Sequence, residues 1–159
     1  INPVEPDAIG QVKAANAQGW DDVTWLYLTS VYSENFAEAI DDAGAGIYVP
    51  AEFYPFTDDS EINSDWRTLM EDNDIPLTSF SQGGYLAATY FIEVLKGIDG
   101  DITRESVSAA LKSMDPIENP MVGTPYAFGT QNTAGWPIIL KSGTHAWEQV
   151  ADDWLRIGE

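Results

Sequence analysis

The stretch that decides the fold is residues 79–96, SFSQGGYLAATYFIEVLK, followed by residues 100–116, GDITRESVSAALKSMDP. In the first stretch apolar side chains recur at the spacing of one helix face, and a glycine follows directly. The recurring positions are Tyr85, Ala88, Ile92 and Leu95. This pattern predicts a helix that ends near Gly97 and buries one apolar stripe.

Polar residues precede both apolar runs, as expected for helix starts. Ser79 and Gln82 have the spacing of a capping box, in which side chains satisfy the first backbone N–H groups. Thr103 stands where it can cap a second helix with a stripe that includes Val107 and Leu111. The sequence therefore predicts two consecutive helices.

The segments before residue 50 alternate between helical and extended patterns. Residues 6–19 and 33–40 have apolar positions and caps typical of helices. Residues 23–28 and 47–49 are rich in β-branched, aromatic and aliphatic side chains, which is typical of strands. Helices and strands alternating at this spacing indicate an α/β layer with a mainly parallel sheet.

Residues 50–64 interrupt this alternation with aromatics, acids and prolines, and they show no sustained period. We interpret them as a connection between two bodies. A helix is predicted at residues 66–70, and short strands at residues 126–128, 137–140 and 147–150 are expected to close the fold.

Residues 79–129 resemble the late part of type I periplasmic binding proteins, the branched-chain amino acid receptor class that feeds ABC transporters. The resemblance lies in GYLAA (84–88), DITRE (101–105) and MVGTPYAFG (121–129). It implies an α/β chain that forms part of a two-lobe, type I fold, with three α/β/α layers and a mainly parallel sheet. It also implies a protein that captures a small molecule and catalyses nothing.

Members of that family are longer than this chain, so the resemblance implies the C-terminal portion of a larger binding protein. By analogy, residues 1–49 and 116–159 belong to the second lobe, and the helices of 66–114 return to the first. Leaving a few hundred Å² of apolar surface uncovered costs several kcal/mol, at about 25 cal/mol per Å². The missing N-terminal lobe or a second copy of the chain is therefore expected to cover residues 66–114.

Two segments supply the candidate ligand-binding residues. The loop with Thr29, Ser30 and Tyr32 follows a predicted strand, and open α/β sheets bind ligands where strands end. The start of the helix at residues 79–96 offers backbone N–H groups, which favour an anion.

The candidates at that helix start are Phe80, Ser81, Gln82 and Tyr85. Neutral donors suit the carboxylate of a ligand, and an aromatic face suits an ammonium group. The ligand class expected is therefore an amino acid or a related small organic acid. Tyr85 also fits a core position, because it shares helical spacing with Ala88 and Ile92.

Composition excludes several classes of partner and site. With 26 acidic and 7 basic residues, the net charge of −19 repels phosphate backbones and anionic lipid headgroups, so no nucleic acid is expected as a partner. There is no cysteine, and His145 is the only histidine, so a zinc site is not expected. The paired acidic residues lack the calcium-loop pattern. Neither a metal nor a cofactor is predicted.

Two other functions remain open from the sequence. The same two-lobe fold also serves as the ligand-binding domain of sensory receptors. A pair of carboxylates that converge within roughly 10 Å in one cleft could hydrolyse glycosides. Other enzyme classes are disfavoured, since the chain has no Gly-x-Ser-x-Gly motif, phosphate-binding loop or cysteine nucleophile.

The expected location is the periplasm or the cell exterior. No run approaches the roughly 18 apolar residues of a membrane span. The sequence begins at Ile1 without a basic segment and an apolar core, so the export signal is expected upstream. The partners implied by the resemblance are a small-molecule ligand and the membrane subunits of an ABC transporter.

Overall fold

The computed structural model of the chain describes residues 3–20, 22–40, 43, 46–141 and 146–156. Its α-helices are α1 (Glu5–Ala17), α2 (Glu34–Ile40), α3 (Ser64–Glu71), α4 (Ser79–Lys96) and α5 (Arg104–Ser113). Two 3-10 helices, η1 (Thr29–Val31) and η3 (Glu61–Asn63), precede α2 and α3. The strands are β1 (Tyr48–Ala51), β2 (Ala134–Lys141), β3 (Ala146–Gln149) and β4 (Leu155–Arg156). The helices predicted from the sequence are thus confirmed.

The named strands form one antiparallel sheet in the order β1-β2-β3, with β4 also paired to β2. A parallel contact occurs at the bridge between Leu26 and Tyr48. The α/β class is confirmed, but the prediction of a mainly parallel sheet is wrong for the described strands. Strand β2 ends at Lys141 and β3 begins at Ala146, a separation too short for the crossover that parallel strands require.

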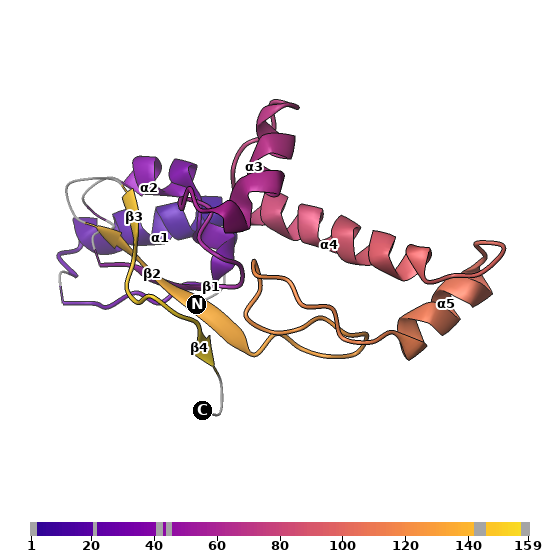
Figure 1. Ribbon diagram of the computed structural model, residues 1–159. Coiled ribbons are helices and arrows are strands. Elements are labelled where there is room, and N and C mark those ends of the chain that lie inside the picture. The colour runs from indigo at the N-terminus through magenta and orange to yellow at the C-terminus, as the bar shows by residue number, and fades with distance from the viewer. Residues whose placement is uncertain (1–2, 21, 41–42, 44–45, 142–145, 157–159) are drawn as a thin grey trace.

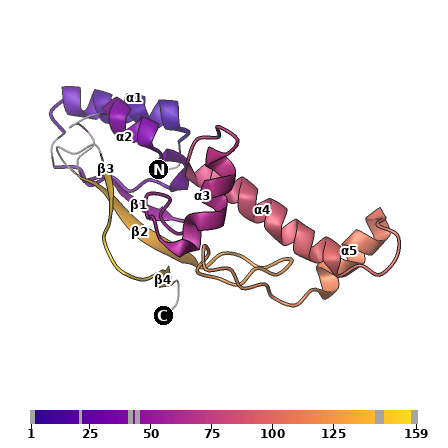
Figure 2. The same cartoon turned by 45° about the horizontal axis from the view of Figure 1, so that its top comes forward.

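The sheet carries a helical layer on one face. Alternate residues of β2 are buried: Ala134, Trp136, Ile138 and Leu140. Figures 1 and 2 show α1 and α2 together over one side of the sheet. Among the described residues no helix covers the other side, where Leu26 and Tyr48 are exposed. The described part of the chain therefore contains two of the three expected layers.

An aromatic cluster joins the helical layer to the sheet. The ring of Tyr32 lies 4.3 Å from that of Phe56 and 5.2 Å from that of Trp147. Trp147 on β3 stacks against Phe36 of α2 and donates its indole N–H to the carbonyl of Ser33 at 2.8 Å. These contacts hold α2, β3 and the segment after β1 together.

Helix α4 buries a different stripe from the predicted one. Its buried residues are Ser79, Gln82, Leu86, Tyr90 and Val94, whereas Ile92 of the predicted stripe is half exposed. The prediction failed because apolar residues lie on both sides of this helix, so spacing alone does not select the buried face. The capping box also begins one residue earlier, with Thr78 and Ser81.

Helices α4 and α5 form an arm that extends from the sheet. Figure 1 shows α4 leading away from the body and α5 at its far end, with residues 116–133 returning beside α4. The returning segment packs on α4 through Tyr126, whose ring stacks 4.6 Å from that of Tyr90. The strand predicted at residues 126–128 is reduced to one bridge between Ile117 and Tyr126.

The two capping boxes provide a test of this division into body and arm. Thr78→Ala removes the cap of α4, whose buried face is part of the core, so we expect a loss of about 1 kcal/mol in the free energy of unfolding. Thr103→Ala removes the same kind of cap from α5, which has no buried residue. Its loss should appear as local fraying, with little change in the global transition. Urea denaturation of both variants measures this, and equal losses would contradict it.

Candidate functional site

The two predicted ligand-binding segments meet at the junction of the sheet and the arm. The hydroxyl of Ser79, at the start of α4, donates to the carbonyl of Thr29 at 3.1 Å and is 3.4 Å from the carbonyl of Tyr32. The hydroxyl of Thr29 accepts from the backbone N–H of Glu52 at 3.2 Å. The structure therefore brings together the loop at residues 29–32, the start of α4 and the end of β1.

Three of the predicted site residues are buried within the chain. Tyr32 is 1% exposed and Gln82 is 0% exposed, and Thr29 is also buried. Burial raises the pKa of the Tyr32 phenol far above its usual value, which keeps the hydroxyl neutral, and its oxygen lies 3.4 Å from that of Thr57. These three side chains support the site from inside the fold in this conformation.

The hydroxyls of the two predicted serines donate to backbone carbonyls. Ser30 donates to Pro3 at 2.9 Å. Ser81 lies 3.0 Å from the carbonyl of Pro76 and 2.9 Å from that of Thr78, and it also caps the helix. Because their protons are used inside the chain, these serines can face a ligand mainly as acceptors.

Phe80 and the first turn of α4 are the parts most open to a ligand. The Phe80 side chain is 70% exposed, although it is large and apolar, and Tyr85 is half-buried one turn further along. The backbone N–H groups of Ser79 and Phe80 have no carbonyl partner within the helix, since they belong to its first turn. An aromatic face beside a helix N-terminus can bind a small anion that has an apolar part.

Sequence reasoning missed two residues on which this site depends. Ser79 was taken as a cap, but its buried hydroxyl binds η1. Asn63 lies in the irregular connection and is completely buried, with its side-chain amide bound to two backbone carbonyls. The position of Ser79 at a helix start indicated a cap and gave no sign of its long-range bond. Nothing in the sequence pattern around Asn63 indicates that its side chain is buried.

A hollow that contains carboxylates lies between the connecting segment and the strands β2 and β3. It is lined by aromatic, amide and acidic residues: Tyr54, Thr57, Asp58, Trp136, Trp147, Glu148, Gln149 and Asp152. Burial raises the pKa of Asp58, but hydrogen bonds from Ser60 and Gln149 outweigh this effect and hold the pKa below its usual range. A general acid needs the opposite shift, so Asp58 is unsuited to that role in a hydrolase.

The residues that the structure describes contain no group of three histidine or acidic side chains arranged to hold a metal ion. His145 and the acidic pair of Asp41 and Asp42 lie outside the described residues. In the same described ranges, no helix is long and apolar enough to cross a membrane.

Most of the chain matches a known family. The family model described as "Periplasmic binding protein" matches residues 1–138. The chain therefore belongs to the periplasmic binding protein family. This agrees with the resemblance found in residues 79–129.

Solved structures show the same fold. A possible leucine/isoleucine/valine-binding protein from Rhodopirellula baltica SH 1 has a TM-score of 0.78 and 19% identity, covering 93% of this chain and 41% of that one. A leucine-binding protein from Thermotoga maritima MSB8 has a TM-score of 0.73 and 12% identity, covering 99% and 44%. A branched chain amino acid ABC transporter from Thermus thermophilus, solved with bound valine, has a TM-score of 0.73 and 15% identity, covering 95% and 44%. The chain thus shares the type I periplasmic binding protein fold of these solved structures.

The chain spans less than half the length of these structures. A CTP synthase from Lactococcus lactis subsp. cremoris (strain MG1363) is 28% identical over 125 residues, which cover 79% of this chain and 23% of the enzyme. So small a share of the enzyme does not bear on the activity of this chain.

The lowered pKa of Asp58 predicts a pH-dependent contribution to stability. Because its pKa is lower in the folded than in the unfolded chain, the carboxylate stabilises the fold above about pH 4, and this contribution is lost as the pH falls through the folded pKa. Asp58→Asn should therefore lower the free energy of unfolding at pH 7. In acid, where Asp58 of the parent is protonated, the variant and the parent should differ little. Asp59→Asn serves as the control, since it removes the same charge from a side chain that is 92% exposed and makes only a solvent-screened ion pair with Arg67 at 3.4 Å. Denaturation of the parent and both variants between pH 7 and 3 measures how much unfolding free energy each variant loses. A loss in Asp58→Asn that does not change with pH would contradict the prediction.

Proposed function

We propose that the chain is the C-terminal part of an extracytoplasmic solute-binding protein, which captures an amino acid or related small carboxylate for an ABC importer. The observation that carries this proposal is the meeting of the loop at residues 29–32 with the start of α4. In a family of binding proteins, a helix N-terminus beside strand ends is a suitable place for a small anion.

The predicted site residues take two roles in this proposal. Phe80, Tyr85, Ser30 and Ser81 would contact the ligand, together with the first backbone N–H groups of α4. The buried group, Thr29, Tyr32 and Gln82, would hold the loop and the helix start in place. The ring of Phe80 suits the apolar part or the ammonium group of an amino acid, and the N–H groups suit its carboxylate.

The exposed apolar faces support the presence of a covering partner. Beside α4, a groove of about 440 Å³ is lined almost wholly by apolar and aromatic side chains: Phe53, Gly83, Leu86, Ala87, Tyr90, Phe91, Val94, Leu111, Tyr126 and Phe128. We propose that residues 66–114 belong to the first lobe, whose N-terminal part covers this groove. A second copy of the chain would be the alternative cover.

The same reasoning assigns residues 1–49 and 116–159 to the second lobe. The exposed Leu26, Leu28 and Tyr48 on the open side of the sheet would then be covered by a helical layer from the longer protein. A protein of this kind works in the periplasm or outside the cell, and it delivers its ligand to transporter membrane subunits without catalysis.

Ligand-induced stabilisation tests this proposal. The longer protein and the 159-residue chain are each heated with leucine, valine, phenylalanine and small aromatic carboxylates. At 100 times its dissociation constant, a ligand should stabilise the longer protein by about 2.7 kcal/mol. The isolated chain should shift much less, since it supplies only one side of the site.

The amide of the best amino acid provides a matched control. It lacks the carboxylate that the α4 N-terminus should bind, so its stabilisation should be smaller. Equal shifts with acid and amide would contradict the assigned role of α4. No shift with any of these compounds would contradict the proposed solute-binding function.

A further inference from the structure

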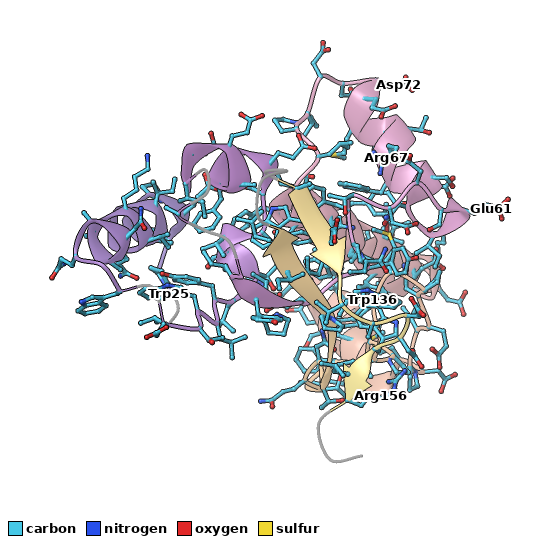
Figure 3. The ribbon with its side chains drawn as sticks, turned by 90° about the vertical axis from the view of Figure 1, so that its left-hand side faces the viewer. Trp25, Glu61, Arg67, Asp72, Trp136 and Arg156 are labelled. Atoms are coloured by element: carbon cyan, nitrogen blue, oxygen red, sulfur yellow. The ribbon has the colours of Figure 1, made fainter. Side chains whose placement is uncertain are left out.

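Four backbone carbonyls of residues 54–58, all except that of Thr57, accept hydrogen bonds from side chains that follow them in the chain. The donors lie on η3, α3 and α4, and Figure 3 shows Arg67 on α3. The bonds run from Gln82 Nε2 to Tyr54 O (2.8 Å), from Asn63 Nδ2 to Pro55 O (2.7 Å) and from Arg67 Nη2 to Phe56 O (2.8 Å). Such regular side-chain capture is unusual for a connection without secondary structure, whose carbonyls normally face water.

The three donors form one connected group. Asn63 and Arg67 both donate to the carbonyl of Asp58, each at 3.1 Å. Gln82 Nε2 also lies 3.3 Å from Asn63 Oδ1. Asn63 and Gln82 are completely buried, so a lost bond could not be replaced by bulk water. We call Asn63, Arg67 and Gln82 the carbonyl-binding cluster.

The captured segment is a connection between the sheet and the arm. It follows the end of β1 at Ala51 and leads into η3 at Glu61. From the sheet side, Gln149 of β3 donates to the carboxylate of Asp58 at 3.0 Å. The segment is therefore bound on one side by the helices and on the other by the sheet.

We infer that the carbonyl-binding cluster fixes the angle between the sheet and α4. A rotation of α4 alone would break the bonds from Gln82 to Tyr54 O and to Asn63. A rotation of α3 and α4 together would also break the bonds from Asn63 and Arg67 to the captured carbonyls, and the buried groups would lose their partners. Asn63, Arg67 and Gln82 are thus positioning residues that need not touch any ligand. In the proposed binding protein they would set the geometry of the connection between the lobes, but the inference itself does not depend on the ligand.

The absence of cysteine in the sequence makes a direct test simple. Cysteines replace Lys13 on α1 and Lys96 on α4, both are spin-labelled, and the distance distribution between the labels is measured in the 159-residue chain. The parent should give one narrow distribution. Arg67→Met and Gln82→Met should broaden or shift it, because each removes donors to the captured carbonyls.

Arg104→Met on α5 is the matched control, since it removes the same charge at an exposed position outside the cluster. The unfolding temperature and the far-ultraviolet circular dichroism of each variant separate a change of angle from a loss of folding. If Gln82→Met does not fold, Arg67→Met decides alone, because the Arg67 side chain is partly exposed (22%), whereas Gln82 is completely buried. A folded Arg67→Met variant with an unchanged distribution, or an Arg104→Met variant that broadens equally, would overturn the inference.

Discussion

The binding of the α4 N-terminus to η1 is the contact on which the candidate site depends. The buried hydroxyl of Ser79 joins a helix start to two carbonyls nearly fifty residues earlier in the chain. A buried hydroxyl without a partner is costly, so this long-range bond also fixes where α4 begins. Because of it, the first N–H groups of the helix, the exposed ring of Phe80 and the loop at residues 29–32 lie at one place. Without this contact, the start of α4 would lose its bond to the loop at residues 29–32.

The sequence predicted the elements of the fold better than their partners. Helices with capping side chains lie where they were predicted, as shown by α2 after Ser33 and α5 after Thr103. Local hydrogen bonds determine such starts, and a sequence records them directly. Strand direction was predicted incorrectly, because β1 pairs with β2 from more than eighty residues later in the chain. No local pattern records that pairing.

The buried face of α4 shows a second limit of sequence reasoning. Apolar residues surround much of this helix. Whether the stripe through Tyr85 or the stripe through Leu86 is buried depends on which side of α4 the rest of the chain packs against. The candidate site residues illustrate the same point. Position in the sequence indicated both segments as candidates, but it could not separate Phe80, which is exposed, from Gln82, which is buried among backbone carbonyls.

In the proposed binding protein, the loop at residues 29–32 and the start of α4 form one side of the ligand site. Hydrogen–deuterium exchange of the longer protein, with and without a saturating amino acid ligand, tests it most directly. We expect slower exchange on binding at residues 29–32 and 79–85, and no change at the far end of α5. Protection confined to other segments, with these two unchanged, would contradict it.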